Sequence, residues 1–359
     1  MAPISFARGA PAPECLDIAL TADCAREAIE RGGAAVLSYG PGGGYAPLRE
    51  WLAERHGVEP GRVIVTNGSL QGFVFIAQRL APGRRVLVEA PTYDRPLKIL
   101  AALDADVVRV PMDEEGLDPD ALERELAAGP PPAFLYTIPT FQNPSGRTLS
   151  VERRRRISEI AERHDLLVIE DDPYGLVRYE GETLPLLFEL EGGERVAYSS
   201  SFSKTVAPGV RVGYFVLPKA LAAEIEDVAV STYISPPALT QATVHELIRR
   251  GAFEPNLERV RGLLRARRDA MLAALERDFP SGTSWSRPEG GYFLWVTFPD
   301  GVVAAELLVR ALEAGVAFVQ GTDFFPAGCG DGTGAARFAF SFESPERIAE
   351  GVARLAELL

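Results

Sequence analysis

The chain has 359 residues, 47% of them hydrophobic and 24% charged, which is enough for a large core and more than one domain. Its formal net charge of -13 leaves no dominant basic face and argues against a nucleic-acid partner. No run of about 18 apolar residues predicts a membrane span, and residues 1–8 are too short and polar for a signal peptide. Three cysteines without metal-ligand spacing predict neither a disulfide framework nor a metal site. We therefore expect a globular cytoplasmic protein.

The chain opens with an irregular arm rich in proline and glycine, over residues 4–13, and a short helix is expected over residues 22–31. A glycine-rich stretch at residues 37–45 then leads into a helix at 47–56. These glycines match neither the dinucleotide fingerprint nor the P-loop spacing, and no strand precedes them. We interpret the stretch as a tight connection into the helix.

From Arg62 onward, apolar runs of four to six residues alternate with helical stretches. Strands are predicted at 63–66, 85–89, 106–110, 133–138, 166–170, 195–198 and 212–217, and the clearest helices are 69–80 and 151–164. Continuous apolar strands alternating with helices are typical of a largely parallel sheet covered on both faces. The sequence therefore predicts an α/β fold with three layers.

Polar residues follow most of these predicted strands. They are Ser69, Tyr93, Asn143, Asp171, Tyr174, Ser201 and Lys204. Ligands of parallel sheets bind beyond the carboxyl ends of the strands, so this shared position predicts that these side chains converge on one site. Taken alone, Lys204 would more simply be a solvated surface lysine, and Ser69 would serve equally well as a helix N-cap.

The chemistry of this set suits a phosphorylated pyridine aldehyde, that is, pyridoxal 5'-phosphate. A partly desolvated lysine can form a Schiff base with a carbonyl, and a buried carboxylate such as Asp171 keeps a pyridine nitrogen protonated. Asn143 and Tyr174 can bind the ring hydroxyl, and Tyr93 can stack on the ring. The expected phosphate ligands are Ser69, Ser201, Ser203 and Arg211.

The combination of motifs resembles fold-type I pyridoxal-phosphate-dependent aminotransferases of class I/II. It is most similar to the kynurenine/2-aminoadipate aminotransferases and to the aminotransferase half of MocR-type regulators. The resemblance covers nearly the whole chain. It rests on Tyr39-Gly40-Pro41, Asn67-Gly68-Ser69, Glu89-Ala90-Pro91-Thr92-Tyr93, Gln142-Asn143-Pro144, Asp171-Asp172-Pro173-Tyr174, Ser201-Phe202-Ser203-Lys204 with Arg211, and Arg337-Phe338-Ala339-Phe340-Ser341.

The resemblance implies a role for each matching position. The implied catalytic residues are Lys204, Asp171 and Tyr174. Lys204 would form the internal aldimine, Asp171 would pair with the pyridine nitrogen, and Tyr174 would bind the ring hydroxyl. The implied cofactor ligands are Ser69, the Leu70 backbone, Tyr93, Asn143, Asp171, Tyr174, Ser201, Ser203, Lys204 and Arg211, with Tyr39 reaching the phosphate of a neighbouring subunit. The last assignment implies a homodimer with shared sites.

The substrate ligands that the resemblance implies are Arg337, Asn143 and Tyr39, with Arg337 clamping the α-carboxylate. Without the resemblance, Arg337 would be a surface arginine at a strand edge. Leu70 departs from the family pattern, which often has glutamine there, so only its backbone can contribute.

The C-terminal part predicts a smaller α+β domain. A long helix at 254–277 is expected to cross from the large domain, followed by a strand at 291–296, a helix at 304–314 and a short strand at 316–319. Tyr233 and Phe324 are expected either to line the substrate pocket or to pack. We divide the chain into residues 1–36 (arm and part of the small domain), 37–255 (large cofactor-binding domain) and 256–359 (small domain).

We therefore expect an aminotransferase that moves the amino group of an L-amino acid to a 2-oxo acid by a ping-pong mechanism. Another pyridoxal-phosphate reaction on the same scaffold, such as β-elimination, decarboxylation or oxidation, remains an alternative, because fold does not fix the reaction. A regulatory effector module is less expected, since the fold starts within the first residues. A nicotinamide dehydrogenase is disfavoured by the missing fingerprint.

Overall fold

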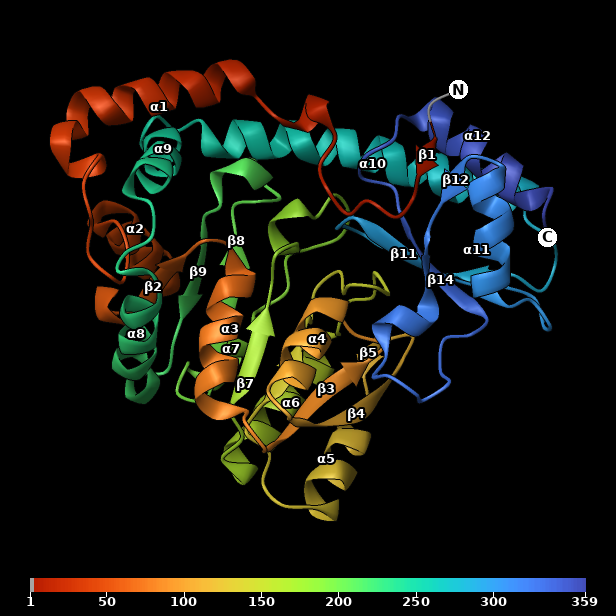
Figure 1. Ribbon diagram of the computed structural model, residues 1–359, viewed down its shortest axis with the longest axis horizontal. Coiled ribbons are helices and arrows are strands. Elements are labelled where there is room, and N and C mark those ends of the chain that lie inside the picture. Colours follow the sequence, from red (N-terminus) through yellow and green to blue (C-terminus); the bar gives the residue numbers. More distant parts are fainter. Residues whose placement is uncertain (1–2) are drawn as a thin grey trace.

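The computed structural model describes residues 3–359 and is built around an eight-stranded sheet (Figure 1). Met1 and Ala2, which belong to the predicted first segment, lie outside the described residues. The sheet order is β2-β9-β8-β7-β6-β3-β4-β5. The strands are β2 (Val63–Thr66), β3 (Arg85–Ala90), β4 (Asp106–Asp113), β5 (Gly116–Leu117), β6 (Leu135–Thr137), β7 (Val168–Asp171), β8 (Val196–Ser201) and β9 (Gly213–Val216).

The centre of this sheet is parallel, as predicted. The pairs β4–β3, β3–β6, β6–β7 and β7–β8 are all parallel, whereas β9 runs antiparallel between β8 and β2. Strands β2, β7, β8 and β9 are buried along their whole length, which explains their continuous apolar runs. Four strands end later than predicted: β3 at Ala90, β4 at Asp113, β7 at Asp171 and β8 at Ser201. Asp171 and Ser201 are polar and still end strands, because both line a cavity.

Helices cover both faces of the sheet, so the predicted three-layer architecture is confirmed. One core contains side chains of α3 (Ser69–Leu80), α4 (Asp94–Ala102) and α8 (Lys219–Tyr233). The core on the opposite face contains side chains of α2 (Ala46–His56), α5 (Pro119–Ala128), α6 (Val151–His164), α7 (Leu187–Glu191), α9 (Ala238–Arg249) and the start of α10 (Phe253–Asp278). α1 (Ile18–Gly32) packs on α9.

The helix ends follow the local sequence. Ser150 caps α6 by accepting a hydrogen bond from the Arg153 backbone N–H, and Asp165 ends that helix in the left-handed conformation. Asp17 caps α1 in the same way, so this helix begins four residues before the predicted start. The predicted stripe of Leu264, Met271 and Leu275 on α10 is fully buried.

A second, smaller sheet lies at the other end of α10. It contains β10 (Ser284–Trp285), β11 (Phe293–Thr297), β14 (Ala335–Ala339) and β13 (Val319–Gln320), in that order, and all of its pairs are antiparallel. β1 (Ile4–Ser5) pairs with β12 (Val316–Ala317) beside it. Together with α10, helices α11 (Ala304–Glu313) and α12 (Pro345–Ala356) bury a separate core there.

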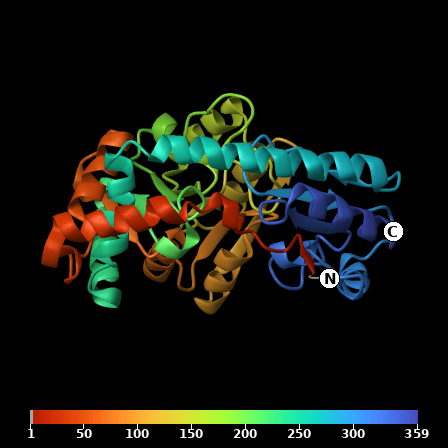
Figure 2. The same cartoon turned by 90° about the horizontal axis from the view of Figure 1, so that it is seen from above.

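α10 joins the two regions. It is 26 residues long, which corresponds to about 39 Å, and it contributes side chains to the core of the large sheet and to that of the small sheet. Figure 2 shows α10 running lengthwise along the molecule, with α1 beside it at one end. Among residues 3–359, no helix is long and apolar enough to cross a membrane.

Candidate active site

A cavity of about 200 Å³ lies at the carboxyl ends of the central strands. It is lined by residues that follow or end those strands, as predicted from the position of the polar residues directly after the strands. The predicted residues that line it are Ser69, Leu70, Tyr93, Asn143, Asp171, Tyr174, Ser201, Ser203, Lys204 and Arg211. The structure therefore brings together ten of the twelve predicted positions, whose individual roles remain predictions.

Lys204 lies in the turn that follows β8. Its Nζ donates a hydrogen bond to the carbonyl oxygen of Gly9, at 2.8 Å, and lies 5.1 Å from the ring centroid of Tyr292 and 5.8 Å from that of Tyr174. Burial, together with the positive charges of Arg337 and Arg211, lowers the pKa of this amine to about 8. Near neutral pH the amine is therefore easier to deprotonate than an ordinary lysine.

Asp171 ends β7 at the floor of the cavity. Its carboxylate accepts hydrogen bonds from the Tyr136 hydroxyl at 2.7 Å and from the Ser199 hydroxyl at 3.1 Å. Burial raises the pKa of this group to about 6, while the two hydrogen bonds favour the charged form. The two hydrogen bonds fix the orientation of the carboxylate, and a positively charged group in the cavity would stabilise its charged form.

Tyr136 and Ser199 were missed by the sequence reasoning. Tyr136 lies inside the predicted strand 133–138 and is about 1% exposed, so its ring looks like an ordinary core residue. Ser199 lies one residue beyond the predicted strand 195–198, although the observed strand β8 includes it. The available signal was the hydroxyl itself, because a buried tyrosine hydroxyl usually requires a hydrogen-bond partner.

An anion cradle forms one wall of the cavity at the start of α3. The N-cap of this helix is Gly68, so no side chain caps it. The backbone N–H groups of Ser69 and Leu70, in the first turn, have no partner within the helix. The Ser69 hydroxyl likewise forms no hydrogen bond within residues 3–359. The alternative in which Ser69 serves as the N-cap is therefore not observed, and its free hydroxyl suits an external anion.

The opposite side of this cradle comes from the β8–β9 hairpin. The Arg211 guanidinium donates to the carbonyl oxygens of Asn67, at 2.8 Å, and Pro208, at 3.3 Å. It packs so closely on Gly68 that a Cβ there would collide with it, and Gly68 has a φ of +90°. The Ser201 and Ser203 hydroxyls lie 2.9 Å apart. These donors line one cavity and suit a phosphate group.

Asn143 and Arg337 connect the two sheets. The Arg337 guanidinium, on β14, donates through Nη1 to the Asn143 side-chain oxygen at 3.0 Å. It is 8% exposed, lies 4.2 Å from the ring centroid of Phe293 and 5.0 Å from that of Phe324, and its Nε is buried without a hydrogen-bond partner. A buried guanidinium with an unused donor is suited to a carboxylate. Arg337 is therefore buried, and the alternative of a surface arginine at a strand edge is not observed.

The N-terminal arm contacts the side chains of both Arg337 and Lys204. After β1, the carbonyl oxygen of Ala7 accepts a hydrogen bond from Nη2 of Arg337, at 2.8 Å, and that of Gly9 accepts from Lys204. A Cβ at Gly9 would meet the Phe293 ring at 2.5 Å, so the arm approaches the small sheet closely. Backbone contacts of this kind leave no pattern in side-chain types, and the sequence reasoning did not find them.

Three other expectations concern residues outside the cavity. Tyr39 is 82% exposed and does not line it. The Tyr233 hydroxyl donates to the carbonyl oxygen of Gly42 at 3.0 Å, and its ring packs on Phe75, so it does not line the cavity either. Phe324 lies beneath Arg337 and against Trp295, with 5.8 Å between those ring centroids. For the last two, packing is the observed outcome.

Glu89 organises the wall between Tyr93 and Asn143, although it does not line the cavity. Its carboxylate accepts hydrogen bonds from the Thr137 hydroxyl at 2.8 Å, from the Ile138 N–H at 2.9 Å and from the Gln142 amide at 3.0 Å. The same Gln142 amide donates to the carbonyl oxygen of Pro91 at 2.8 Å. The loops that carry Tyr93 and Asn143 are therefore tied to one buried carboxylate, whose pKa is raised by burial to about 7.

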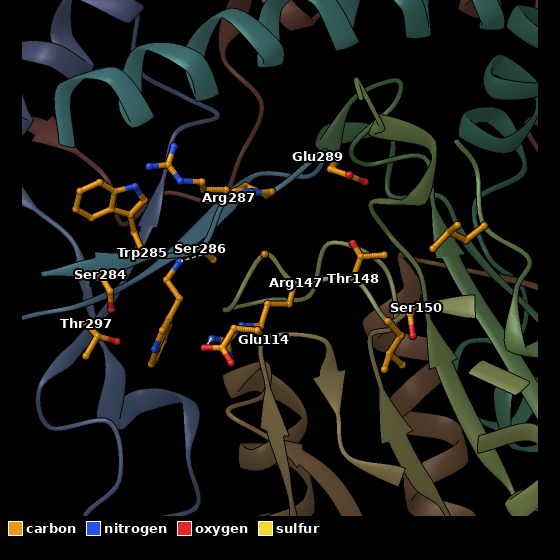
Figure 3. A pocket seen from close by; sticks show the side chains of 15 residues that line it. Glu114, Arg147, Thr148, Ser150, Ser284, Trp285, Ser286, Arg287, Glu289 and Thr297 are labelled. Carbon is orange, nitrogen blue, oxygen red and sulfur yellow. Dashed lines mark hydrogen bonds and ion pairs between the residues drawn. The ribbon is translucent and has the colours of Figure 1, made fainter. Parts of the chain in front are cut away.

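A larger hollow, of about 470 Å³, lies between residues 146–150 and the β10–β11 hairpin (Figure 3). None of the predicted site residues lines it. Its arginines are already paired: Arg147 lies 3.4 Å from Glu114, and Arg287 lies 2.7 Å from Glu276. Size alone would favour this hollow, but the amine, the buried carboxylate and the free anion cradle all lie in the smaller cavity.

Comparisons with known proteins agree with this placement of the site. The family model for aminotransferase class I and II matches residues 12–355. An aromatic-amino-acid aminotransferase of Thermococcus litoralis is 35% identical over 99% of this chain and 88% of its own length. The α-aminoadipate aminotransferase of Thermus thermophilus, solved with N-(5'-phosphopyridoxyl)-L-leucine, is 39% identical, with a TM-score of 0.94 over 99% of this chain and 92% of that one.

The kynurenine aminotransferase of Pyrococcus horikoshii was solved with pyridoxamine phosphate, kynurenine and the reaction product. It is 36% identical, with a TM-score of 0.94 over 100% of this chain and 91% of that one. The match to the family model covers most of the chain, and the fold agrees with those of solved members. The expected family is confirmed: this chain belongs to the class I and II aminotransferases, which depend on pyridoxal phosphate.

Proposed function

We propose that this chain moves the amino group of an L-amino acid to a 2-oxo acid in two half-reactions at one site, with pyridoxal 5'-phosphate as cofactor. One observation carries the proposal: a single cavity of about 200 Å³ holds a lysine amine, a buried carboxylate and an anion cradle with unused donors. Amino-group transfer needs these three groups around one planar cofactor.

The residues that would hold the cofactor divide by chemistry. Asp171 suits the pyridine nitrogen, Tyr93 suits the ring face, and Asn143 and Tyr174 suit the ring hydroxyl. The proposed phosphate ligands are Ser69, the Leu70 backbone, Ser201, Ser203 and Arg211. When bound, the cofactor draws electrons from the substrate carbon that carries the amino group, which makes the proton on that carbon acidic.

Lys204 is proposed as the residue that takes this proton and later returns it. A general base works best when its pKa lies near the working pH, and the pKa of this amine is lowered to about 8. Arg337 is proposed to bind the α-carboxylate of the substrate, with Asn143 holding the guanidinium in place at 3.0 Å. The arm over the cavity would restrict the access of water while the proton is transferred.

A homodimer with shared sites is proposed for the assembly. Four exposed apolar residues support it: Leu37 (63% exposed), Tyr39 (82%), Val230 (41%) and Ile234 (59%). They lie on adjoining segments, because the Gly40 N–H donates to the Ser235 hydroxyl at 3.2 Å. An exposed apolar patch is typical of an interface, and Tyr39 would then contribute to the site of the partner subunit.

Two further assignments accompany the proposal. The division between residues 37–255 and 256–359 is supported by the two separate sheets. Of the described residues in 1–36, Ile4 and Phe6 belong to the core of the small sheet, whereas Cys15 and Cys24 belong to that of the large sheet. A cytoplasmic location is supported by Cys15, Cys24 and Cys329, which are all free thiols.

The decisive experiment replaces Lys204 by alanine. We expect turnover to fall by at least about 10³-fold, because both the base and the point of covalent attachment are lost. Borohydride reduction followed by mass spectrometry should place the cofactor on the Lys204 peptide of the unaltered protein and of the control variant, and on no peptide of Lys204→Ala. Lys98→Ala is the matched control, because Lys98 is an exposed lysine paired with Asp94 at 2.7 Å.

The reaction type is tested by product stoichiometry in a single turnover. Transamination yields one 2-oxo acid and one pyridoxamine phosphate per site. Release of ammonia, carbon dioxide or peroxide instead would refute transamination and support the alternative reactions on this scaffold.

A further inference from the structure

Asp171 is held from both of the strands that flank its own. β7 lies between β6 and β8, and both pairs are parallel. Tyr136, on β6, donates its hydroxyl proton to Oδ2 of Asp171 at 2.7 Å, and Ser199, on β8, donates to Oδ1 at 3.1 Å. Each carboxylate oxygen therefore accepts one hydrogen bond from a neighbouring strand and keeps acceptor capacity for a group in the cavity.

The Tyr136 hydroxyl remains a donor throughout the working pH range. Burial raises the pKa of this phenol well above its ordinary value, and the negative charge of Asp171 acts in the same direction. The ring lines the cavity and packs edge-on against Phe73, with 5.1 Å between the ring centroids. A fixed ring that always carries its proton is suited to orienting a carboxylate.

The other groups around Asp171 do not replace these two hydroxyls. Burial and the charge of Asp172 raise the pKa of Asp171 to about 6, and Glu89, on β3, is a further buried carboxylate nearby. Among residues 3–359, no cationic side chain forms an ion pair with Asp171. The remaining titratable groups that line the cavity are Tyr93, Tyr174, Lys204 and Arg211. Within the protein, the charged form of Asp171 is therefore favoured mainly by Tyr136 and Ser199.

We propose that Tyr136 is a positioning residue of the reaction: its hydroxyl, supported by that of Ser199, keeps the Asp171 carboxylate charged and directed at the pyridine nitrogen of the cofactor. The inference rests on the proposed function, in which Asp171 pairs with this nitrogen. Tyr136 acts through Asp171 and not on the substrate. Without the hydroxyl, the carboxyl group keeps its proton at a higher pH and loses the ion pair that holds the pyridine nitrogen protonated.

The opposite face of the same sheet provides a matched control. Asp172 directly follows Asp171, and its carboxylate accepts a hydrogen bond from the Tyr198 hydroxyl at 3.1 Å. Tyr198 is buried, as Tyr136 is, but it belongs to the core on the other face and does not line the cofactor cavity. Tyr136→Phe and Tyr198→Phe thus each remove one hydroxyl from a buried tyrosine–aspartate pair, and only the first should affect the site.

The probe for the test is pyridoxine 5'-phosphate, which has an alcohol in place of the aldehyde and so binds without a covalent bond to Lys204. Its affinity for the cofactor-free protein is measured by calorimetry between about pH 5 and pH 9, and should fall as Asp171 gains its proton. A hydrogen bond to a charged acceptor changes an equilibrium constant about 10- to 100-fold, so Tyr136→Phe should shift this fall upward by about one to two pH units. Tyr198→Phe should leave the profile unchanged. The ionisations of the probe itself are the same for every variant, so only differences between variants are compared.

Asp171→Asn separates positioning from packing. An asparagine has no charge to preserve, so adding Tyr136→Phe to Asp171→Asn should change probe affinity by less than about threefold. Ser199→Ala removes the longer hydrogen bond and should shift the profile in the same direction by a smaller amount, which provides the test if Tyr136→Phe does not fold.

Two results would overturn the proposal. One is an unshifted profile in Tyr136→Phe, or in Ser199→Ala where the first variant does not fold. The other is an equal loss of affinity on removal of the Tyr136 hydroxyl with and without the Asp171 carboxylate, which would show that Tyr136 only supports packing. Failure of the unaltered protein to bind the probe would instead refute the proposed function.

Discussion

Replacing Glu89 by glutamine tests whether a buried carboxylate organises the site at a cost in stability that depends on pH. Burial raises the pKa of Glu89 from 4.5 to about 7 in the folded protein, although three hydrogen bonds favour the charged form. In the unfolded chain, the carboxyl group loses its proton near its ordinary value. Between about pH 4.5 and pH 7 the folded state therefore binds more protons than the unfolded state, and the free energy of unfolding falls as pH rises.

The size of this effect follows from the difference between the two pKa values. Each tenfold change in proton affinity corresponds to about 1.4 kcal/mol, so Glu89 should lower stability by about 3 kcal/mol between pH 4.5 and pH 8. A glutamine side chain does not ionise, so the variant lacks this pH dependence. Its amide oxygen can still accept from Ile138 and Gln142, and its NH₂ group can face the Thr137 hydroxyl. We expect Glu89→Gln to cost about 1 kcal/mol at pH 5 and to stabilise by about 2 kcal/mol at pH 8.

Urea unfolding of the cofactor-free protein at pH 5 and pH 8 measures both values. Glu114→Gln is the control, because the Glu114 side chain is 91% exposed, and it should change stability by less than about 0.5 kcal/mol at either pH. If the difference between Glu89→Gln and the unaltered protein is the same at both pH values, Glu89 does not titrate as the structure indicates and the reasoning is wrong.

Three further predictions concern the site. Arg337→Lys should lower kcat/KM about 100-fold and leave cofactor affinity within about twofold, since a lysine cannot form the bidentate pair; steady-state kinetics and cofactor titration check this, and an equal loss of cofactor affinity would contradict it. Binding of pyridoxal phosphate to cofactor-free protein, followed by absorbance, should accelerate as pH rises through about 8, where Lys204 loses its proton; a flat profile would exclude the lowered pKa. A hybrid dimer of one Lys204→Ala and one Tyr39→Ala chain should regain activity at one of its two sites, whereas an inactive hybrid would place Tyr39 in its own subunit's site.

The sheet and the position of the cavity could be predicted because both depend on local patterns. Buried parallel strands require continuous apolar runs, and these runs stop where the chain becomes polar, so most strand limits were correct within two residues. Asp171 and Ser201 show where the pattern was insufficient. Each is polar, yet each forms the last pair of a strand, because the edge of the sheet faces a cavity there.

Contacts that depend on tertiary structure could not be predicted in this way. The hydrogen bond from Tyr136 to Asp171 joins residues 35 positions apart, and nothing in the strand sequence distinguishes this ring from a core tyrosine. The contacts of Ala7 and Gly9 use backbone oxygens, which every residue type has. The roles of Lys204 and its neighbours in catalysis remain predictions that the experiments above address.

The link between Asn143 and Arg337 has a consequence for how such an enzyme diversifies. The side chains proposed for the cofactor come from the eight-stranded sheet and its loops, whereas Arg337, the proposed ligand of the substrate carboxylate, comes from the four-stranded sheet. If these roles hold, substitutions in the smaller sheet should alter substrate binding without changing the phosphate cradle. Asn143 is the point where the two sets meet, because it accepts the hydrogen bond from Arg337 at 3.0 Å.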